Sequence, residues 1–88
     1  LLQNYPNPFN PVTKIRFNIP AFTETTRRVV SLRIYDVLGK EIAILVNENL
    51  KPGIYEIDWN AENIPSGVYF YSLITNEFTQ TKKMVVLK

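Results

Sequence analysis

Residues 13–19 of the chain read Thr-Lys-Ile-Arg-Phe-Asn-Ile, and this stretch decides the fold class. Its apolar side chains, Ile15, Phe17 and Ile19, alternate with those of a lysine, an arginine and an asparagine. Successive side chains of a β-strand point to opposite faces of a sheet, so a repeat of two predicts a strand with one buried face. Helical spacing fits the stretch less well than this alternation.

A second stretch with the same repeat, residues 53–59, reads Gly-Ile-Tyr-Glu-Ile-Asp-Trp. Its aromatic and apolar side chains at Tyr55, Ile57 and Trp59 are expected to point inward, and its two carboxylates are expected to face solvent. A further strand should place Val30, Leu32 and Ile34 inward.

The rest of the chain continues this pattern of apolar stretches separated by turns. Apolar stretches follow at 41–46, 68–75 and 78–87, and polar, turn-rich stretches lie at 23–28, 36–40, 47–52, 60–66 and 76–77. Within 36–40, Gly39 tolerates a positive φ. Short strands with such turn spacing predict an all-β fold, an immunoglobulin-like antiparallel β-sandwich of about seven strands.

The core of this sandwich must form without a disulfide, because the chain has no cysteine. Trp59, together with Phe17, Tyr69 and Tyr71, is expected to fill the place that a buried disulfide takes in antibody domains. A chain of 88 residues leaves room for one domain, so these side chains should carry much of its stability.

The composition argues against an enzyme. Histidine and cysteine are both absent, which removes the usual nucleophile systems and the common zinc and haem ligands. No catalytic residue, cofactor or metal is therefore expected. The net charge of +2 is too small for a nucleic-acid or membrane-surface partner, and no apolar run is long enough to span a membrane.

Two groups of oxygen-bearing side chains are candidate sites. Glu56 and Asp58 share one face of a strand, and they are expected to lie on its solvent side opposite Lys14 and Arg16 of a neighbouring strand. The spacing of Asp58, Asn60 and Glu62 resembles a calcium loop, but the required glycine is missing, so the sequence leaves a calcium site there open.

The first residues form a proline-rich lead-in. Three of the six prolines lie within residues 5–11, which excludes a helix there. We expect a strap whose two aromatic rings, Tyr5 and Phe9, dock on the domain; a proline-rich ligand for a partner module is the alternative. The predicted division is a lead-in or linker at 1–12 and a sandwich at 13–88. Because the chain begins with Leu1 and shows no signal-peptide pattern, we expect it to be part of a longer protein.

The carboxyl end is unusual because the last strand becomes more apolar toward its end, with lysines on both sides. Such a strand either pairs within its own sheet or presents an edge to which another protein can add a strand. The candidate recognition residues are Lys82, Lys83, Met84, Val85, Val86, Leu87 and Lys88.

Six stretches in this order carry a resemblance to a known family. They are Tyr-Pro-Asn-Pro-Phe-Asn-Pro at 5–11, Thr-Lys-Ile-Arg-Phe at 13–17, Leu-Arg-Ile-Tyr-Asp-Val-Leu-Gly-Lys-Glu at 32–41, Gly-Ile-Tyr at 53–55, Ser-Gly-Val-Tyr-Phe-Tyr at 66–71 and Thr-Lys-Lys-Met-Val-Val-Leu-Lys at 81–88. Together they resemble the type A carboxy-terminal sorting domain of the bacterial type IX secretion system. The family's signature positions are matched by Gly53, Tyr55, Gly67, Tyr69 and residues 83–88, with Trp59 and Tyr71 as further structural positions.

This resemblance implies that the domain is a sorting signal rather than an enzyme. Such domains end cargo proteins of Gram-negative bacteria, fold in the periplasm, and are recognised by the outer-membrane type IX translocon. A surface sortase-type protease then commonly removes them, so that the cargo reaches the cell surface or the medium. We would look for the cleavage site just before Tyr5. The other partners implied are the amino-terminal cargo domains of the same chain.

Two other functional hypotheses remain. The first half of the chain also resembles the immunoglobulin-like domain of flagellar hook-capping proteins, so a structural or adhesion module that self-associates through its last strand is the main alternative. A hydrolase or lectin is the other. The short 60–66 stretch favours the sorting domain over the hook-capping domain, which usually has a longer insertion there.

Overall fold

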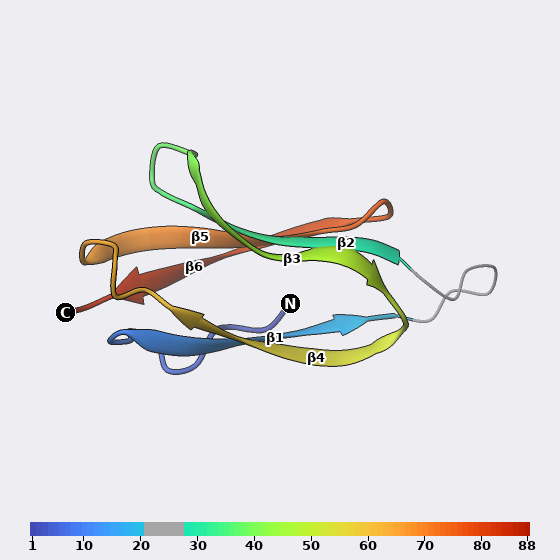
Figure 1. Ribbon diagram of the computed structural model, residues 1–88, viewed down its shortest axis with the longest axis horizontal. Coiled ribbons are helices and arrows are strands. Elements are labelled where there is room, and N and C mark those ends of the chain that lie inside the picture. Colours follow the sequence, from blue (N-terminus) through green and yellow to red (C-terminus); the bar gives the residue numbers. More distant parts are fainter. Residues whose placement is uncertain (21–27) are drawn as a thin grey trace.

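A computed structural model of the chain describes residues 1–20 and 28–88, and these residues form six strands and no helix. The strands are β1 (Val12–Ile19), β2 (Arg28–Tyr35), β3 (Glu41–Leu50), β4 (Gly53–Asn60), β5 (Gly67–Ile74) and β6 (Thr79–Val86). They make two antiparallel sheets, one in the order β1-β4 and one in the order β3-β2-β5-β6 (Figure 1). The prediction of an all-β sandwich is confirmed.

The alternation that predicted β1 sets its buried face. Every second side chain of β1 is buried, and Ile15, Phe17 and Ile19 point into the space between the sheets. From the facing sheet, β2 contributes Val30 and Leu32 together with Ile34, all fully buried. Because both sheets bury one face against the other, the repeat of two in the sequence translates directly into the core.

Trp59 is buried in this core and lies beside Tyr69, as predicted, but Phe17 and Tyr71, its other expected partners, make different contacts. Its ring lies 6.5 Å from that of Tyr69 and 6.0 Å from that of Phe9, which comes from the proline-rich lead-in. Phe17 stacks instead on Tyr55, with ring centroids 5.5 Å apart. The lead-in therefore supplies part of the aromatic cluster.

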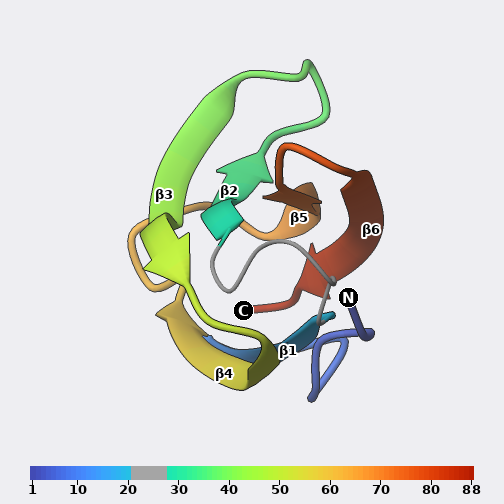
Figure 2. The same ribbon diagram turned by 90° about the vertical axis from the view of Figure 1, so that its right-hand side faces the viewer.

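Residues 1–11, which we call the strap, lie between β1 and β6 (Figure 2). The Leu2 N–H donates to the carbonyl of Arg16, and Tyr5 and Lys14 exchange two backbone hydrogen bonds. Phe9 docks as predicted and is 3% exposed, but the prediction for Tyr5 was wrong, because its ring is 78% exposed. The backbone of Tyr5, not its ring, attaches the strap to β1. The division at residue 12 stays a prediction.

One predicted loop is placed differently in the structure, and another lies almost wholly outside the described residues. β3 continues to Leu50, so the predicted turn at 47–52 was placed too early; the polar residues there pair with β2 as far as Arg28, opposite Leu50. Backbone pairing does not require apolar side chains on an edge strand, so polarity misled the prediction. The predicted loop at 23–28 lies outside the described residues, except that Arg28 begins β2.

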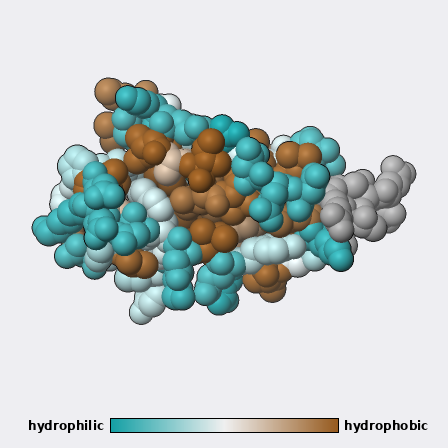
Figure 3. Space-filling view, in the orientation of Figure 1, coloured by the Kyte–Doolittle hydropathy of each residue, from teal (hydrophilic) through white to brown (hydrophobic). Residues whose placement is uncertain are grey.

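The turn between β2 and β3 matches its prediction. Gly39 adopts φ +83°, a conformation that residues with a Cβ rarely take, and the Asp36 carboxylate accepts hydrogen bonds from the backbone of Leu38 and Lys40. This rigid turn leaves the apolar side chains of Val37 and Leu38 exposed, and apolar surface is visible there in Figure 3.

Candidate functional site

The candidate recognition residues at 82–88 form most of β6 and the end of the chain. β6 pairs with β5 along its whole length, from Gly67 opposite Val86 to Ile74 opposite Thr79. The segment has two sides. Met84 and Val86 are fully buried in the core, whereas Leu87 is 56% exposed and Lys83 and Lys88 are exposed. The apolar ending is therefore first of all part of the fold, and its outward residues are what a partner could contact.

The strap occupies the outer edge of β6. The carbonyl of Lys83 accepts a hydrogen bond from the Gln3 side-chain amide at 2.7 Å, and the Val85 N–H donates to Oδ1 of Asn7 at 3.0 Å. The N–H and carbonyl of Phe9 bond the carbonyl of Val85 at 3.1 Å and the N–H of Leu87 at 3.0 Å. β6 is thus bonded on both sides in the part of the chain that the structure describes.

A buried polar network anchors the strap. The Tyr71 hydroxyl donates to the carbonyl of Leu2 and accepts from the N–H of Asn4, both at 2.8 Å. The Asn4 side chain donates to the Thr13 hydroxyl at 3.0 Å, and that hydroxyl donates to the carbonyl of Pro6 at 2.9 Å. Asn4, Thr13 and Tyr71 are all buried, so these bonds satisfy groups that water does not reach.

This network makes stability depend on pH through Tyr71. Burial raises the pKa of its phenol above the ordinary value of 10.0, although the hydrogen bond from Asn4 offsets part of the effect. The folded state thus favours the neutral phenol, whose contribution is complete below a pH of about 10 and is lost as the pH rises through the folded-state pKa. We expect the stability difference between the wild type and Tyr71→Phe to shrink above that pH.

Urea denaturation of both chains at a series of pH values measures this difference. At neutral pH the variant should be less stable by about 1–3 kcal/mol, because the backbone groups of Leu2 and Asn4 lose their partner. A stability difference that stays constant up to strongly alkaline pH would show that the phenol is not held neutral by the fold.

Lys88, the last residue of the segment, is also held in place by hydrogen bonds. Its Nζ donates to the carbonyl of Glu62 at 2.6 Å, and its backbone N–H donates to the hydroxyl of Ser66 at 2.9 Å. These contacts attach Lys88 to the connection between β4 and β5. The end of the chain therefore has a defined position beside Leu87.

The sequence echo of Gly53-Ile-Tyr55 and Gly67-Val-Tyr69 corresponds to one repeated arrangement. Each glycine begins a strand, with φ of +153° and +154°, and the tyrosine two residues later lies over it. The Tyr55 hydroxyl donates to the carbonyl of Lys51 at 2.6 Å, and that of Tyr69 to the carbonyl of Pro65 at 2.8 Å. Both pairs define how the chain enters β4 and β5.

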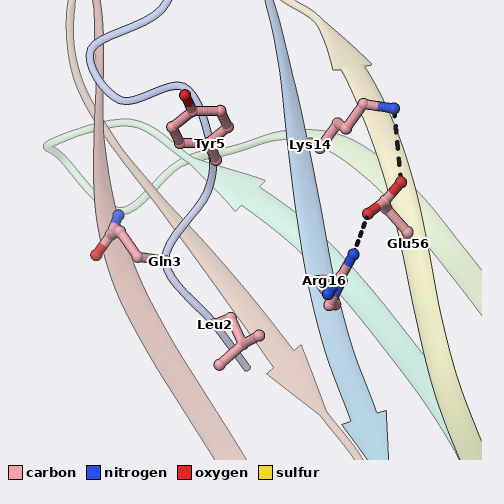
Figure 4. A pocket seen from close by; sticks show the side chains of 6 residues that line it. All are labelled: Leu2, Gln3, Tyr5, Lys14, Arg16 and Glu56. Carbon is pink, nitrogen blue, oxygen red and sulfur yellow. Dashed lines mark hydrogen bonds and ion pairs between the residues drawn. The ribbon is translucent and has the colours of Figure 1, made fainter.

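The carboxylate pair behaves as a solvent-facing group, as predicted. β1 and β4 pair so that Arg16 lies opposite Glu56, with the side chains 3.0 Å apart, and Lys14 bonds Glu56 at 3.5 Å and Asp58 at 3.3 Å. The hydrogen bond from Arg16 is the main cause that lowers the pKa of Glu56. Lys14, Arg16 and Glu56 line a pocket together with Leu2, Gln3 and Tyr5 of the strap (Figure 4).

Side chains of the stretch that resembled a calcium loop bond other groups of the protein. Oδ1 of Asn60 accepts from the N–H of Glu62 at 3.0 Å, and Asp58 is paired with Lys14. Within residues 1–20 and 28–88, no cluster of three or more metal-ligating side chains occurs. In the same residues, no helix is long and apolar enough to cross a membrane.

The strap residues that contact β6 were not identified from the sequence as site residues. Gln3 and Asn7 bond the outer edge of β6 through side-chain amides, and Phe9 does so through its backbone. The proline-rich composition indicated an extended segment, but an amide that bonds a distant backbone leaves no spacing signal in a sequence.

Comparison with known protein families gave a match over most of the chain. A family model described as "Secretion system C-terminal sorting domain" matches residues 3–87, which include both the strap and β6. Searches of curated proteins and of solved structures gave no match. The match extends over nearly the whole chain, from the strap to the last residue but one. The chain therefore belongs to the family of C-terminal sorting domains of the type IX secretion system.

Proposed function

We propose that this chain directs the protein that carries it through the type IX translocon of the outer membrane, and that residues 82–88 are the segment the translocon recognises. The observation that carries the proposal is the family match over residues 3–87. The arrangement of the last strand supports it, because β6 ends in exposed basic and apolar side chains that the core does not use: Lys83, Leu87 and Lys88.

Within this segment the residues would have different roles. Met84 and Val86 hold the strand in the core, and Leu87 offers apolar contact area. Lys82, Lys83 and Lys88 would add charge that steers association. The route would run from the periplasm to the cell surface or the medium of a Gram-negative bacterium. No catalytic residue or cofactor is proposed.

We also propose that a surface sortase-type protease separates cargo from domain just before Tyr5. Tyr5 bonds Lys14 through both of its backbone groups, and Asn4 is buried. A protease that binds its substrate as an extended strand would therefore need the strap to leave β1 first.

Export of a reporter fused in front of the chain tests the proposal in a host with a type IX system. We expect a variant with serine in place of Lys82, Lys83 and Lys88 to export about tenfold less, because charge steering changes association rates by factors of 10 or more. The matched control carries serine at Lys40 and Lys51, two exposed lysines outside the segment. Thermal melting checks that both variants stay folded, because Lys88→Ser also removes the hydrogen bond from Nζ to the carbonyl of Glu62.

If both lysine variants are exported like the wild type, the translocon does not recognise the segment through the charges of its lysines. If none of the chains, the wild type included, is exported although all fold, the sorting function itself is wrong for this domain in that host.

The second candidate is a structural module that self-associates. The strap covers the outer edge of β6, so association through the last strand would require its removal, whereas the sheet order ends at β3 on the opposite edge. Figure 3 shows apolar surface in the middle of one face of the molecule. Separately, β3 and β4 carry Leu45 and Ile57, which are half-buried against the core. A sedimentation mass that rises with concentration would favour this candidate.

A further inference from the structure

The outer edge of β6 has the features of a strand-addition site. In an antiparallel sheet, alternate residues direct their backbone groups to the same side. Lys83, Val85 and Leu87 direct theirs away from β5, and each is bonded to the strap. These three residues belong to the proposed recognition segment, so its backbone is already in use.

The strap covers this edge with fewer main-chain bonds than a regular strand would make. Of its four hydrogen bonds to Lys83, Val85 and Leu87, two come from the side-chain amides of Gln3 and Asn7 and two from the backbone of Phe9. Pro6 and Pro8 have no N–H to donate. An extended segment with a regular backbone could therefore replace these bonds and add more.

The space filled by the Phe9 ring, which we call the Phe9 pocket, sets what such a segment must carry. The Phe9 ring is buried between the sheets, 6.0 Å from the ring of Trp59. When Phe9 leaves, the pocket and the outward groups of Val85 and Leu87 become accessible together. A replacing segment needs an aromatic or large apolar side chain at that place to avoid leaving a cavity.

We propose that the outer edge of β6 together with the Phe9 pocket is a strand-acceptor site, which the strap occupies within the chain, and that the translocon inserts an extended segment with an aromatic anchor in its place. This rests on the proposed function, because it supplies the partner. Strap and partner compete for the same backbone groups, so recognition of the carboxyl end requires release of residues 3–9.

The first test uses the purified chain and needs no secretion system. Asn7→Ala removes the side chain that bonds Val85, and Asn10→Ala is the matched control, since Asn10 is exposed in the same segment. Loss of one hydrogen bond should speed hydrogen exchange at the Leu87 amide about fivefold. Leu87 is the informative amide, because its own acceptor, the carbonyl of Phe9, is unchanged in the variant.

The second test supplies the occupant in trans. A peptide with the sequence of residues 1–11 is titrated into the isotope-labelled chain while the Val85 and Leu87 amide resonances are followed. The site is open only in the fraction of molecules whose strap is released, so Asn7→Ala should bind the peptide about fivefold more tightly than wild type or Asn10→Ala. A peptide with alanine in place of its phenylalanine should bind none of the chains. Absence of saturable shifts at these amides in Asn7→Ala would overturn the acceptor site.

Export separates this inference from the function on which it rests. With a reporter fused in front, Asn7→Ala should be exported about fivefold faster than Asn10→Ala, because its edge is uncovered more often. If both are exported equally fast although the peptide binds as expected, the translocon does not use this edge and the inference fails. If neither these variants nor the wild type is exported, it is the sorting function that fails, and the peptide titration still decides whether the edge accepts a strand.

Discussion

A chain truncated after Lys82 is expected to lose cooperative unfolding altogether. The deletion removes Met84 and Val86, both fully buried, and deletion of a single such side chain costs about 2–5 kcal/mol. It also removes the pairing of β6 with residues 67–70 of β5 and leaves Phe9 without its backbone partners. A domain of this size has about 5–10 kcal/mol of stability, so these losses exceed what it can tolerate.

Circular dichroism during thermal and urea denaturation measures this effect, and a chain lacking only Lys88 is the control that should keep a cooperative transition. Two-state melting of the longer truncation close to that of the wild type would mean that the end of β6 is not part of the core. The prediction matters for function, because a truncation that abolishes export would report the loss of the fold. Substitution of Lys82, Lys83 and Lys88, none of which lies in the core, tests recognition with less of that ambiguity.

Replacing Trp59 with alanine should have the next largest effect. The side chain is 7% exposed and packs between the rings of Phe9 and Tyr69, which come from the strap and from β5. Truncation of a buried tryptophan costs about 3–5 kcal/mol, and here the cavity would also loosen Phe9. We expect the variant to bind a hydrophobic dye and to show no cooperative melting.

Trp59→Phe is the matched control, because it keeps an aromatic ring between the same neighbours and should retain a transition at a lower temperature. If Trp59→Ala instead melts cooperatively near the wild-type temperature, the contacts of Trp59 with Phe9 and Tyr69 do not hold the strap to the core. In that case the strap would depend on the Tyr71 network and on its hydrogen bonds to β1 and β6.

Taken together, these contacts join the strap to the carboxyl-terminal segment of the chain. The strap lies where the chain enters β1, and the proposed recognition residues lie at its other end, yet Phe9 and Val86 form a bridge. A translocon that binds the outer edge of β6, as we propose, would therefore require a folded domain whose strap has been released.

The sequence by itself determined which side chains face inward. The alternation of apolar and polar residues identified the buried faces of β1, β2 and β4. The same pattern predicted that Glu56 lies opposite Lys14 and Arg16. Gly39 indicated the turn between β2 and β3. These features are local, because the pleat of a strand assigns each side chain to a face before the strand has any neighbour.

Only the tertiary structure decided which edges meet. The sequence of residues 82–88 does not indicate whether the outer edge of their strand is open or covered. Likewise, nothing in residues 1–11 indicates that Asn7 and Phe9 bond β6 while the Tyr5 side chain stays in solvent. The physical reason is that strand pairing uses backbone N–H and carbonyl groups, which nearly every residue type carries. A sequence therefore shows the face of a strand clearly and leaves its neighbours to the packing of the whole chain.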